Sequence, residues 1–310
     1  MYFCFYNYYE MSKLKAWISA ARLRTLPLSI SGIIIAAAAA AHIEQFSKII
    51  FWLAIATTLG FQVLSNFAND YGDGIKGTDN DDRVGPARAF QSGLLTAKEL
   101  KKGMIFIAIV TLLLASMLIF AAFGNNNFVL SLLYFNLGIA AIIAAVKYTV
   151  GKSAYGYRAL GDVFVFIFFG LVGVLGCYFL FTESLSDYII LPAITIGLLS
   201  VAVLNLNNMR DRLSDIKVNK NTLAVVLGET RVKMYHSALI VGGFSSALVY
   251  FLLQDRGLYS FLPLVAFIPL FLNIIKVYKT DIPKNLDPEL KKVALSTFFF
   301  SILFFITTLI

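Results

Sequence analysis

Charged side chains are scarce in this sequence. Only 14% of its 310 residues are Asp, Glu, Lys or Arg, whereas a soluble domain carries about 25%. Hydrophobic residues make up 59% of the chain, and the mean hydropathy is +0.78. A soluble core of this length cannot bury so much apolar surface, so lipid must be the solvent for most of the chain. The composition therefore excludes a soluble enzyme and predicts an integral membrane protein.

Cysteine and a recognisable leader are also lacking. The two cysteines, Cys4 and Cys177, have no spacing typical of a disulfide framework or of a cysteine metal site. The first ten residues are aromatic rather than a basic stretch followed by an apolar one, so we expect no cleaved signal peptide. We interpret residues 1–24 as an N-terminal tail followed by an interfacial helix, because segment 11–23 is mixed in polarity.

The rest of the chain is divided into apolar runs, each close to the roughly 20 residues that a helix needs to span the hydrocarbon core. Nine such runs cover residues 25–43, 48–68, 103–123, 128–147, 160–181, 187–206, 234–254, 258–278 and 293–310. The sequence thus predicts an all-α membrane protein with nine transmembrane helices, in which residues 25–310 form a single domain.

The basic residues are distributed unevenly between the two sides of these spans. With the N-terminus in the cytoplasm, 24 of the 26 Lys and Arg lie in cytoplasmic segments, and only Lys48 and Arg256 lie on the other side. The positive-inside rule predicts this orientation. It also accounts for the formal net charge of +8 without a nucleic-acid partner. Two cytoplasmic loops, 69–102 and 207–233, are long, and long loops usually have a function.

The first long loop opens with spaced aspartates. Asp70 and Asp73 are three residues apart, so a helix that continues beyond the second span carries both on one face. Two neighbouring carboxylates repel each other unless a cation lies between them. Hard oxygen ligands of this kind suit Mg²⁺ that is shared with substrate phosphates.

The second long loop repeats this chemistry. Asp211 and Asp215 are four residues apart and again share a helical face. Two amides precede them and basic residues are interleaved with them: Asn207, Asn208, Arg210, Lys217 and Lys220. Carboxylates that hold a metal ion and cations that hold phosphate oxygens give this pattern.

A single acidic pair at a helix end is often only a solvated face. Two such clusters on the same side of a membrane favour a function. Ionisation of an allylic diphosphate needs this combination, because Mg²⁺ and basic side chains neutralise the leaving group. The apolar prenyl tail would then lie between transmembrane helices. A transporter is the alternative from another class, but it predicts ionisable groups near the bilayer midplane, whereas here they lie at the ends of the spans.

Longer motifs around these aspartates resemble those of the UbiA-type membrane prenyltransferases, from about Trp17 to the end of the chain. In that superfamily two Asp-rich motifs follow the second and sixth of nine spans, as they do here. Within it, the chain is most similar to the 1,4-dihydroxy-2-naphthoate polyprenyltransferases. The residues that carry this likeness are Ala21–Leu28, Asn69–Asp73, Lys76–Asp79, Asp82–Pro86, Tyr157–Asp162 and Asn208–Leu223, although Asn219 stands where the family commonly has Gly.

The resemblance implies a Mg²⁺-dependent transfer of a polyprenyl group to the naphthoate ring, with loss of CO₂ and diphosphate. It implies that the metal ligands are Asp70, Asp73, Asp79, Asp211 and Asp215. Asn69, Asn207 and Asn208 would complete the metal–diphosphate site, and Lys76, Arg83, Arg210 and Lys220 would bind diphosphate oxygens. It further implies that Tyr148 stands near the allylic carbon, where its ring stabilises positive charge.

The acceptor stays open at this point. Enzymes that prenylate 4-hydroxybenzoate, homogentisate, haem or chlorophyllide share the acidic motifs. Arg24, with Arg22, lies at the mouth of the first span and would hold an acceptor carboxylate, or would serve only as a positive-inside anchor. The expected partners are a polyprenyl diphosphate, an aromatic acceptor and the lipid bilayer, and the expected location is a bacterial inner membrane.

Overall fold

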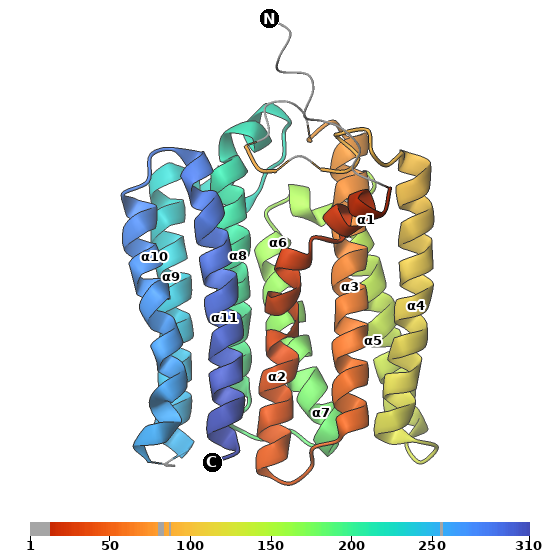
Figure 1. Cartoon of the computed structure of the whole chain (residues 1–310), viewed down its shortest axis with the longest axis vertical. Helices are drawn as coiled ribbons and strands as arrows, with labels where there is room; N and C mark the ends of the chain where they lie inside the picture. Colours follow the sequence, from red (N-terminus) through yellow and green to blue (C-terminus); the bar gives the residue numbers. More distant parts are fainter. Residues whose placement is uncertain (1–12, 80–83, 87, 255–256) are drawn as a thin grey trace, which may run out of the picture.

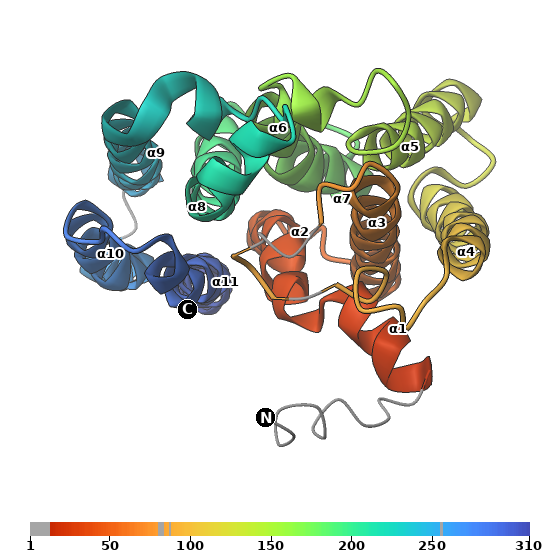
Figure 2. The ribbon, with the colours of Figure 1, turned by 90° about the horizontal axis from the view of Figure 1, so that it is seen from above.

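The computed structural model describes residues 13–79, 84–86, 88–254 and 257–310. In this part of the chain all regular secondary structure is helical, and nine helical segments are long and apolar enough to cross a membrane. The prediction of nine spans is confirmed. The predicted interfacial segment contains the short helix α1 (Lys13–Ala21), which lies across one end of the bundle (Figures 1 and 2).

The first four spans are single helices. After α1 and a short 3₁₀ turn, η1 (Leu23–Thr25), these are α2 (Leu26–His42), α3 (Lys48–Ile75), α4 (Ala97–Phe123) and α5 (Phe128–Lys147). Helix α4 begins six residues earlier than hydropathy predicts. Its first turn is closed by a capping box, in which Thr96 and Glu99 satisfy each other's backbone N–H groups, and such a box stabilises a polar helix start.

The other spans are less regular. The fifth combines α6 (Gly161–Val165), a π-helical stretch η3 (Phe166–Gly176) and α7 (Cys177–Thr182), and follows the 3₁₀ turn η2 (Tyr155–Tyr157). The sixth and seventh are α8 (Ile190–Lys217) and α9 (Leu223–Gln254), with a kink at Gly228 in α9. The eighth combines η4 (Leu258–Phe267) and α10 (Ile268–Tyr278), and the ninth combines η5 (Pro283–Leu286) and α11 (Asp287–Thr308).

Some helices are longer than a bilayer requires, among them the two that carry the acidic motifs. Helices α3 and α8 have 28 residues each, which is about 42 Å at 1.5 Å per residue against a hydrocarbon core of about 30 Å. Their final turns therefore extend past the core. Asp70 and Asp73 lie on the last turns of α3, and Asp211 and Asp215 lie on the last turns of α8. These aspartates therefore belong to helix ends and not to loops as expected. Only Asp79 lies in a connection between helices.

Seen from above, α2 stands near the middle of the bundle, between α11 on one side and α3 on the other, while α4, α9 and α10 lie toward the outside (Figure 2). The long connections gather at the end where α1 lies, above α3 and α8 (Figure 1). Helix α5 buries little of its surface, as expected for a helix whose outer face contacts lipid.

Candidate active site

Asp73 is the centre of the first acidic motif. Its side chain lies in the last turn of α3 and is 1% exposed. The Tyr157 hydroxyl donates to Asp73 Oδ1 at 2.7 Å, and Arg88 Nη1 donates to Asp73 Oδ2 at 3.0 Å. Lys220 Nζ lies 3.5 Å from the same oxygen. Three different segments thus converge on one carboxylate.

Arg88 joins the parts of this motif. Its Nε lies 3.1 Å from Asp79 Oδ2 and its Nη1 also donates to the main-chain oxygen of Asn69 at 2.8 Å. The guanidinium therefore fixes the connection after α3 against the last turns of that helix. Asp70 lies one turn before Asp73 and is also 1% exposed, and α3 continues through both aspartates as predicted.

The second acidic motif is built around Arg210, which is 1% exposed. Its Nε and Nη2 donate to the two oxygens of Asp211 at 2.9 and 2.7 Å, a bidentate pair. Nη2 also donates to Asn207 Oδ1 at 2.9 Å, and Nη1 donates to Asp287 Oδ1 at 2.5 Å. Asp287 begins α11, so Arg210 ties the sixth span to the ninth.

Lys220 connects the two motifs. Its Nζ lies 3.5 Å from Asp73 and 3.9 Å from Asp215. The segment before α6 lies between them, since Tyr157 contacts Asp73 while the Ala159 N–H donates to the Asn221 oxygen at 2.7 Å. The two motifs are 138 residues apart when counted from Asp73 to Asp211, yet they form one polar centre.

The placement of these carboxylates is costly for folding. The C-terminal end of a helix carries partial negative charge, and Asp73 and Asp215 are buried at such ends. Buried charges without partners are strongly destabilising. The cations Arg88, Arg210 and Lys220 offset part of this cost.

A cavity of about 550 Å³ begins at this polar centre and extends between the helices. Its mouth is lined by Asp73, Arg88, Asn207, Asn208 and Lys220, together with Arg22 and Arg24. Its deeper walls are aromatic and aliphatic and come from α2, α3, α4, α5, α8 and the irregular fifth span, including Phe164, Phe168, Phe169, Leu118 and Leu180. A smaller recess of about 340 Å³ adjoins the mouth and is lined by Asp70.

Tyr148 stands on the wall of the cavity between these two regions. It follows α5 directly and packs edge-on against Tyr155, with ring centroids 5.2 Å apart. The Cβ that an alanine would add at Gly156 or Gly161 would meet Tyr148 at 2.7 or 3.0 Å, so these glycines let the neighbouring backbone close on the tyrosine. Burial raises the pKa of its phenol, which therefore stays neutral.

The other predicted site residues lie as follows. Asn69, Asn207, Asn208, Arg24 and Lys220 line the cavity, and Arg24 also forms a long ion pair with Asp287, at 3.9 Å. Lys76 does not line it, since its Nζ stands 3.8 Å from the centre of the Tyr157 ring. Arg83 lies outside the described residues.

The site also contains three residues to which the sequence analysis gave no role: Arg88, Tyr157 and Asp287. Arg88 and Asp287 each lie near other polar residues in the sequence, and no local motif distinguishes them from these neighbours. Tyr157 belongs to a motif that supports the resemblance, which was the available signal. Burial and the adjacent Asp73 raise the pKa of its phenol, so it remains a hydrogen-bond donor to that carboxylate.

Within the described ranges, no three His, Cys, Asp or Glu side chains are grouped closely enough to hold a metal ion. Arg88 and Lys220 stand between the carboxylates, so the predicted five-aspartate metal site remains a prediction. The donor set nevertheless fits a divalent cation. Asp70 Oδ1 is buried and has no hydrogen-bond partner, and carboxylate oxygens are the ligands that Mg²⁺ prefers.

The profile of the UbiA prenyltransferase family matches residues 29–303. The chain belongs to the UbiA prenyltransferase family. It is 42% identical over 300 residues to the 1,4-dihydroxy-2-naphthoate octaprenyltransferase of Haemophilus influenzae, covering 96% of this chain and 97% of the relative. It is 40% identical over 259 residues to the Escherichia coli enzyme of the same name, covering 83% of each chain.

Solved structures of UbiA homologues share the fold of this UbiA family member. The apo homologue from Aeropyrum pernix K1 superposes with a TM-score of 0.64 at 13% identity, covering 88% of this chain and 95% of that one. The homologue from Archaeoglobus fulgidus, solved bound to DMAPP and Mg²⁺, superposes with a TM-score of 0.60 at 16% identity, covering 93% and 99%.

Proposed function

We propose that the protein transfers a polyprenyl group from a polyprenyl diphosphate to 1,4-dihydroxy-2-naphthoate, and so forms a demethylmenaquinol. The observation that carries the proposal is the single cavity that joins the buried carboxylate–cation centre to an apolar interior. The choice of acceptor is supported by the two relatives at 42% and 40% identity, because both are named 1,4-dihydroxy-2-naphthoate octaprenyltransferase.

Mg²⁺ is the cofactor of this proposal. Asp70, Asp73, Asp79, Asp211 and Asp215 would hold it, and its charge would neutralise the diphosphate leaving group. The buried Asp70 Oδ1, which has no hydrogen-bond partner, supports a divalent cation at this place. The Archaeoglobus fulgidus homologue bound to DMAPP and Mg²⁺ supports it as well.

Residues at different depths of the cavity would have different roles in the reaction. Lys220 and Arg88 lie at the mouth, where they would bind diphosphate oxygens and stabilise the charge that develops as the C–O bond breaks. Tyr148 presents a neutral aromatic ring between the mouth and the apolar walls, where it would stabilise the allylic cation. The aromatic walls would exclude the water that otherwise captures this cation.

The reaction balances without a further reactant. The ring supplies the electron pair of the new C–C bond, and the C–O bond of the prenyl diphosphate breaks with its pair on the diphosphate. Loss of CO₂ returns the electron pair of the carboxyl bond to the ring. The products are a demethylmenaquinol, CO₂ and diphosphate.

We place the enzyme in a bacterial inner membrane, with the polar centre on the cytoplasmic side. The distribution of Lys and Arg supports this orientation.

An assay of the purified protein tests the proposal. The protein is incubated with a polyprenyl diphosphate, Mg²⁺ and either 1,4-dihydroxy-2-naphthoate or 4-hydroxybenzoate, and the lipid product is followed by mass. We expect a prenylated naphthoquinol that is absent after addition of EDTA. Product from 4-hydroxybenzoate alone would refute the acceptor but keep the reaction class, and product in the presence of EDTA would refute the role of Mg²⁺.

A further inference from the structure

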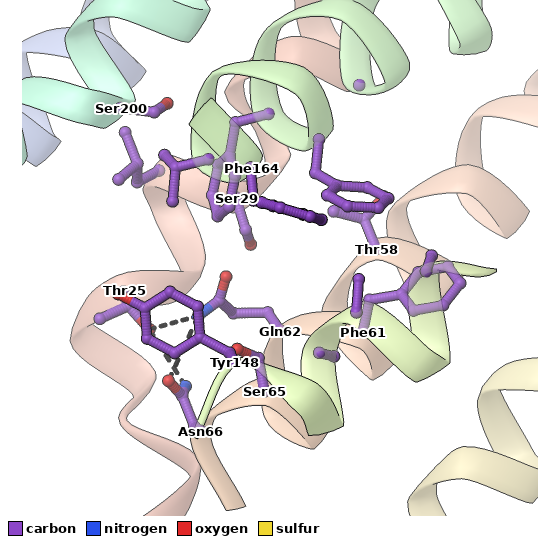
Figure 3. A pocket seen from close by; sticks show the side chains of 18 of the residues that line it. Thr25, Ser29, Thr58, Phe61, Gln62, Ser65, Asn66, Tyr148, Phe164 and Ser200 are labelled. Carbon is purple, nitrogen blue, oxygen red and sulfur yellow. Dashed lines mark hydrogen bonds between the residues drawn. The ribbon is translucent and has the colours of Figure 1, made fainter. Parts of the chain in front are cut away.

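One wall of the cavity is neither charged nor apolar. Thr25, at the start of α2, and two amides of α3, Gln62 and Asn66, form a hydrogen-bonded strip that faces the cavity near Tyr148 (Figure 3). Gln62 Nε2 lies 3.4 Å from Thr25 Oγ1 and 3.3 Å from Asn66 Oδ1. We call these three residues the polar strip.

The polar strip ends on two main-chain oxygens, of Ala21 and Arg22, and these acceptors fix the direction of every hydrogen bond within it. Asn66 donates at 2.8 Å to the main-chain oxygen of Ala21, which can only accept, so its amide nitrogen must point there. Asn66 Oδ1 then needs a donor, and Gln62 supplies its Nε2. The Thr25 hydroxyl donates to the Arg22 main-chain oxygen at 2.9 Å and accepts from both amides.

Within the polar strip, these hydrogen bonds leave Gln62 Oε1 as the group that is available to a ligand. Both amide nitrogens are committed, and Gln62 Oε1 accepts no hydrogen bond from any described residue. Figure 3 shows this oxygen directed away from Thr25 and Asn66, into the cavity. The polar strip therefore offers a hydrogen-bond acceptor at a fixed position, and a ligand that binds it must carry a donor.

The chemistry of the two substrates decides which one uses this oxygen. A prenyl diphosphate has acceptor oxygens and an apolar tail, and it has no neutral donor to offer. A dihydroxynaphthoate has two ring hydroxyls and a carboxylate. The cations Arg22 and Arg24 also line this cavity and lie within three residues of Thr25 in the chain, where they suit the carboxylate.

We propose that Gln62 Oε1 accepts a hydrogen bond from a ring hydroxyl of the aromatic acceptor, with Asn66 and Thr25 as the residues that orient it. The inference rests on the proposed function and names the part of the site that selects the acceptor. Gln62 is a specificity residue because it touches the substrate, whereas Asn66 and Thr25 are positioning residues.

The test compares 1,4-dihydroxy-2-naphthoate with two analogues, each lacking one ring hydroxyl. Equilibrium binding is measured by calorimetry on native protein and on Gln62→Met, which keeps the length of the side chain but removes the amide. Native protein should bind one analogue about 10-fold more weakly than the dihydroxy compound. Gln62→Met should bind the dihydroxy compound about 10-fold more weakly and should no longer distinguish that analogue from it.

Kinetics separate substrate recognition from general damage. In Gln62→Met the KM for the acceptor should rise while the KM for prenyl diphosphate stays within about twofold of native. Gln45→Leu, an exposed glutamine in the connection between α2 and α3 at the other end of the bundle, is the matched control. Thr25→Val should shift acceptor binding in the same direction, and Thr25→Ser should restore it.

The possible failures can be told apart. If native protein does not prenylate dihydroxynaphthoate, the proposed function is wrong, and the same comparison is made with 4-hydroxybenzoate against benzoate. If Gln62→Met still distinguishes the hydroxylated acceptor from its analogue, or if it raises both KM values equally, the role of Gln62 is wrong whatever the acceptor.

Discussion

The guanidinium of Arg88 contacts two carboxylates of the first acidic motif at once, with Nη1 3.0 Å from Asp73 Oδ2 and Nε 3.1 Å from Asp79 Oδ2. Both aspartates are buried. Because these contacts use two different nitrogens of one planar group, a lysine cannot reproduce them. Arg88 therefore sets how far apart two predicted metal ligands lie.

Replacement of Arg88 tests this role. We expect Arg88→Lys and Arg88→Gln to lower kcat by about 10–100-fold, since partners that orient metal ligands have effects of this size. Steady-state rates at saturating substrates measure the loss. The control is Arg231→Gln, an exposed arginine in α9. A native rate in Arg88→Gln would show that the two aspartates do not depend on Arg88.

The two acidic motifs should both be needed for turnover. We expect Asp73→Asn and Asp211→Asn each to lower kcat by about 100-fold or more, because neutralisation of the leaving group acts mainly in the transition state. Each variant should still elute as a folded protein in detergent. Asp281→Asn, an exposed aspartate after α10, is the control, and native activity in both site variants would remove the metal–diphosphate assignment.

Tyr157 should act through its hydroxyl. In Tyr157→Phe the donor to Asp73 Oδ1 is lost, but the ring beneath Lys76 remains. We expect kcat to fall by about 10-fold, at the low end of the effects of such partners. Tyr188→Phe, an exposed tyrosine near the start of α8, should have no effect. An equal loss in both variants would point to general destabilisation instead.

The irregular fifth span should depend on a close helix contact. A Cβ at Gly170 would lie 2.7 Å from the Ala193 oxygen and 2.8 Å from the Gly197 Cα, both in the backbone of α8. We expect Gly170→Ala to reduce stability by about 1–3 kcal/mol, the usual cost of overpacking, seen as a lower melting temperature in detergent. Gly138→Ala is the matched control because nothing lies within 4 Å of its Cβ.

Orientation in the membrane can be measured by cysteine labelling. In a background with Cys4→Ser, Lys152→Cys lies in the connection after α5 and Asn126→Cys lies between α4 and α5, at opposite ends of the bundle. We expect a membrane-impermeant thiol reagent applied to intact cells to label position 126 and not position 152. The reverse pattern would invert the proposed topology.

The spans were predictable because hydropathy alone decides whether a segment of about 20 residues enters lipid. The run 103–123 shows the limit of this reasoning. Helix α4 begins at Ala97 because a capping box closes a polar first turn, and hydropathy does not register such a turn. In the same way, α3 and α8 continue past their apolar runs and carry the aspartates on their last turns.

The acidic residues were predictable as chemistry but not as geometry. Asp73 and Asp211 could be recognised because their spacing from other aspartates is local in the sequence. The contact of Lys220 with Asp73 of the first motif and Asp215 of the second depends on the packing of α3 against segments that come much later in the chain. The same packing places the cations Arg88 and Arg210 beside the carboxylates.

The sequence by itself determined the membrane environment, the number of spans and the two acidic motifs, since each follows from composition or from spacing within one helix. Only the tertiary structure decided that Tyr157 donates to Asp73, that Asp287 pairs with Arg210, and that Gln62 turns its oxygen into the cavity. The physical reason is that a hydrogen bond or ion pair depends on distance and direction between groups. Those are set when helices distant in the chain pack together.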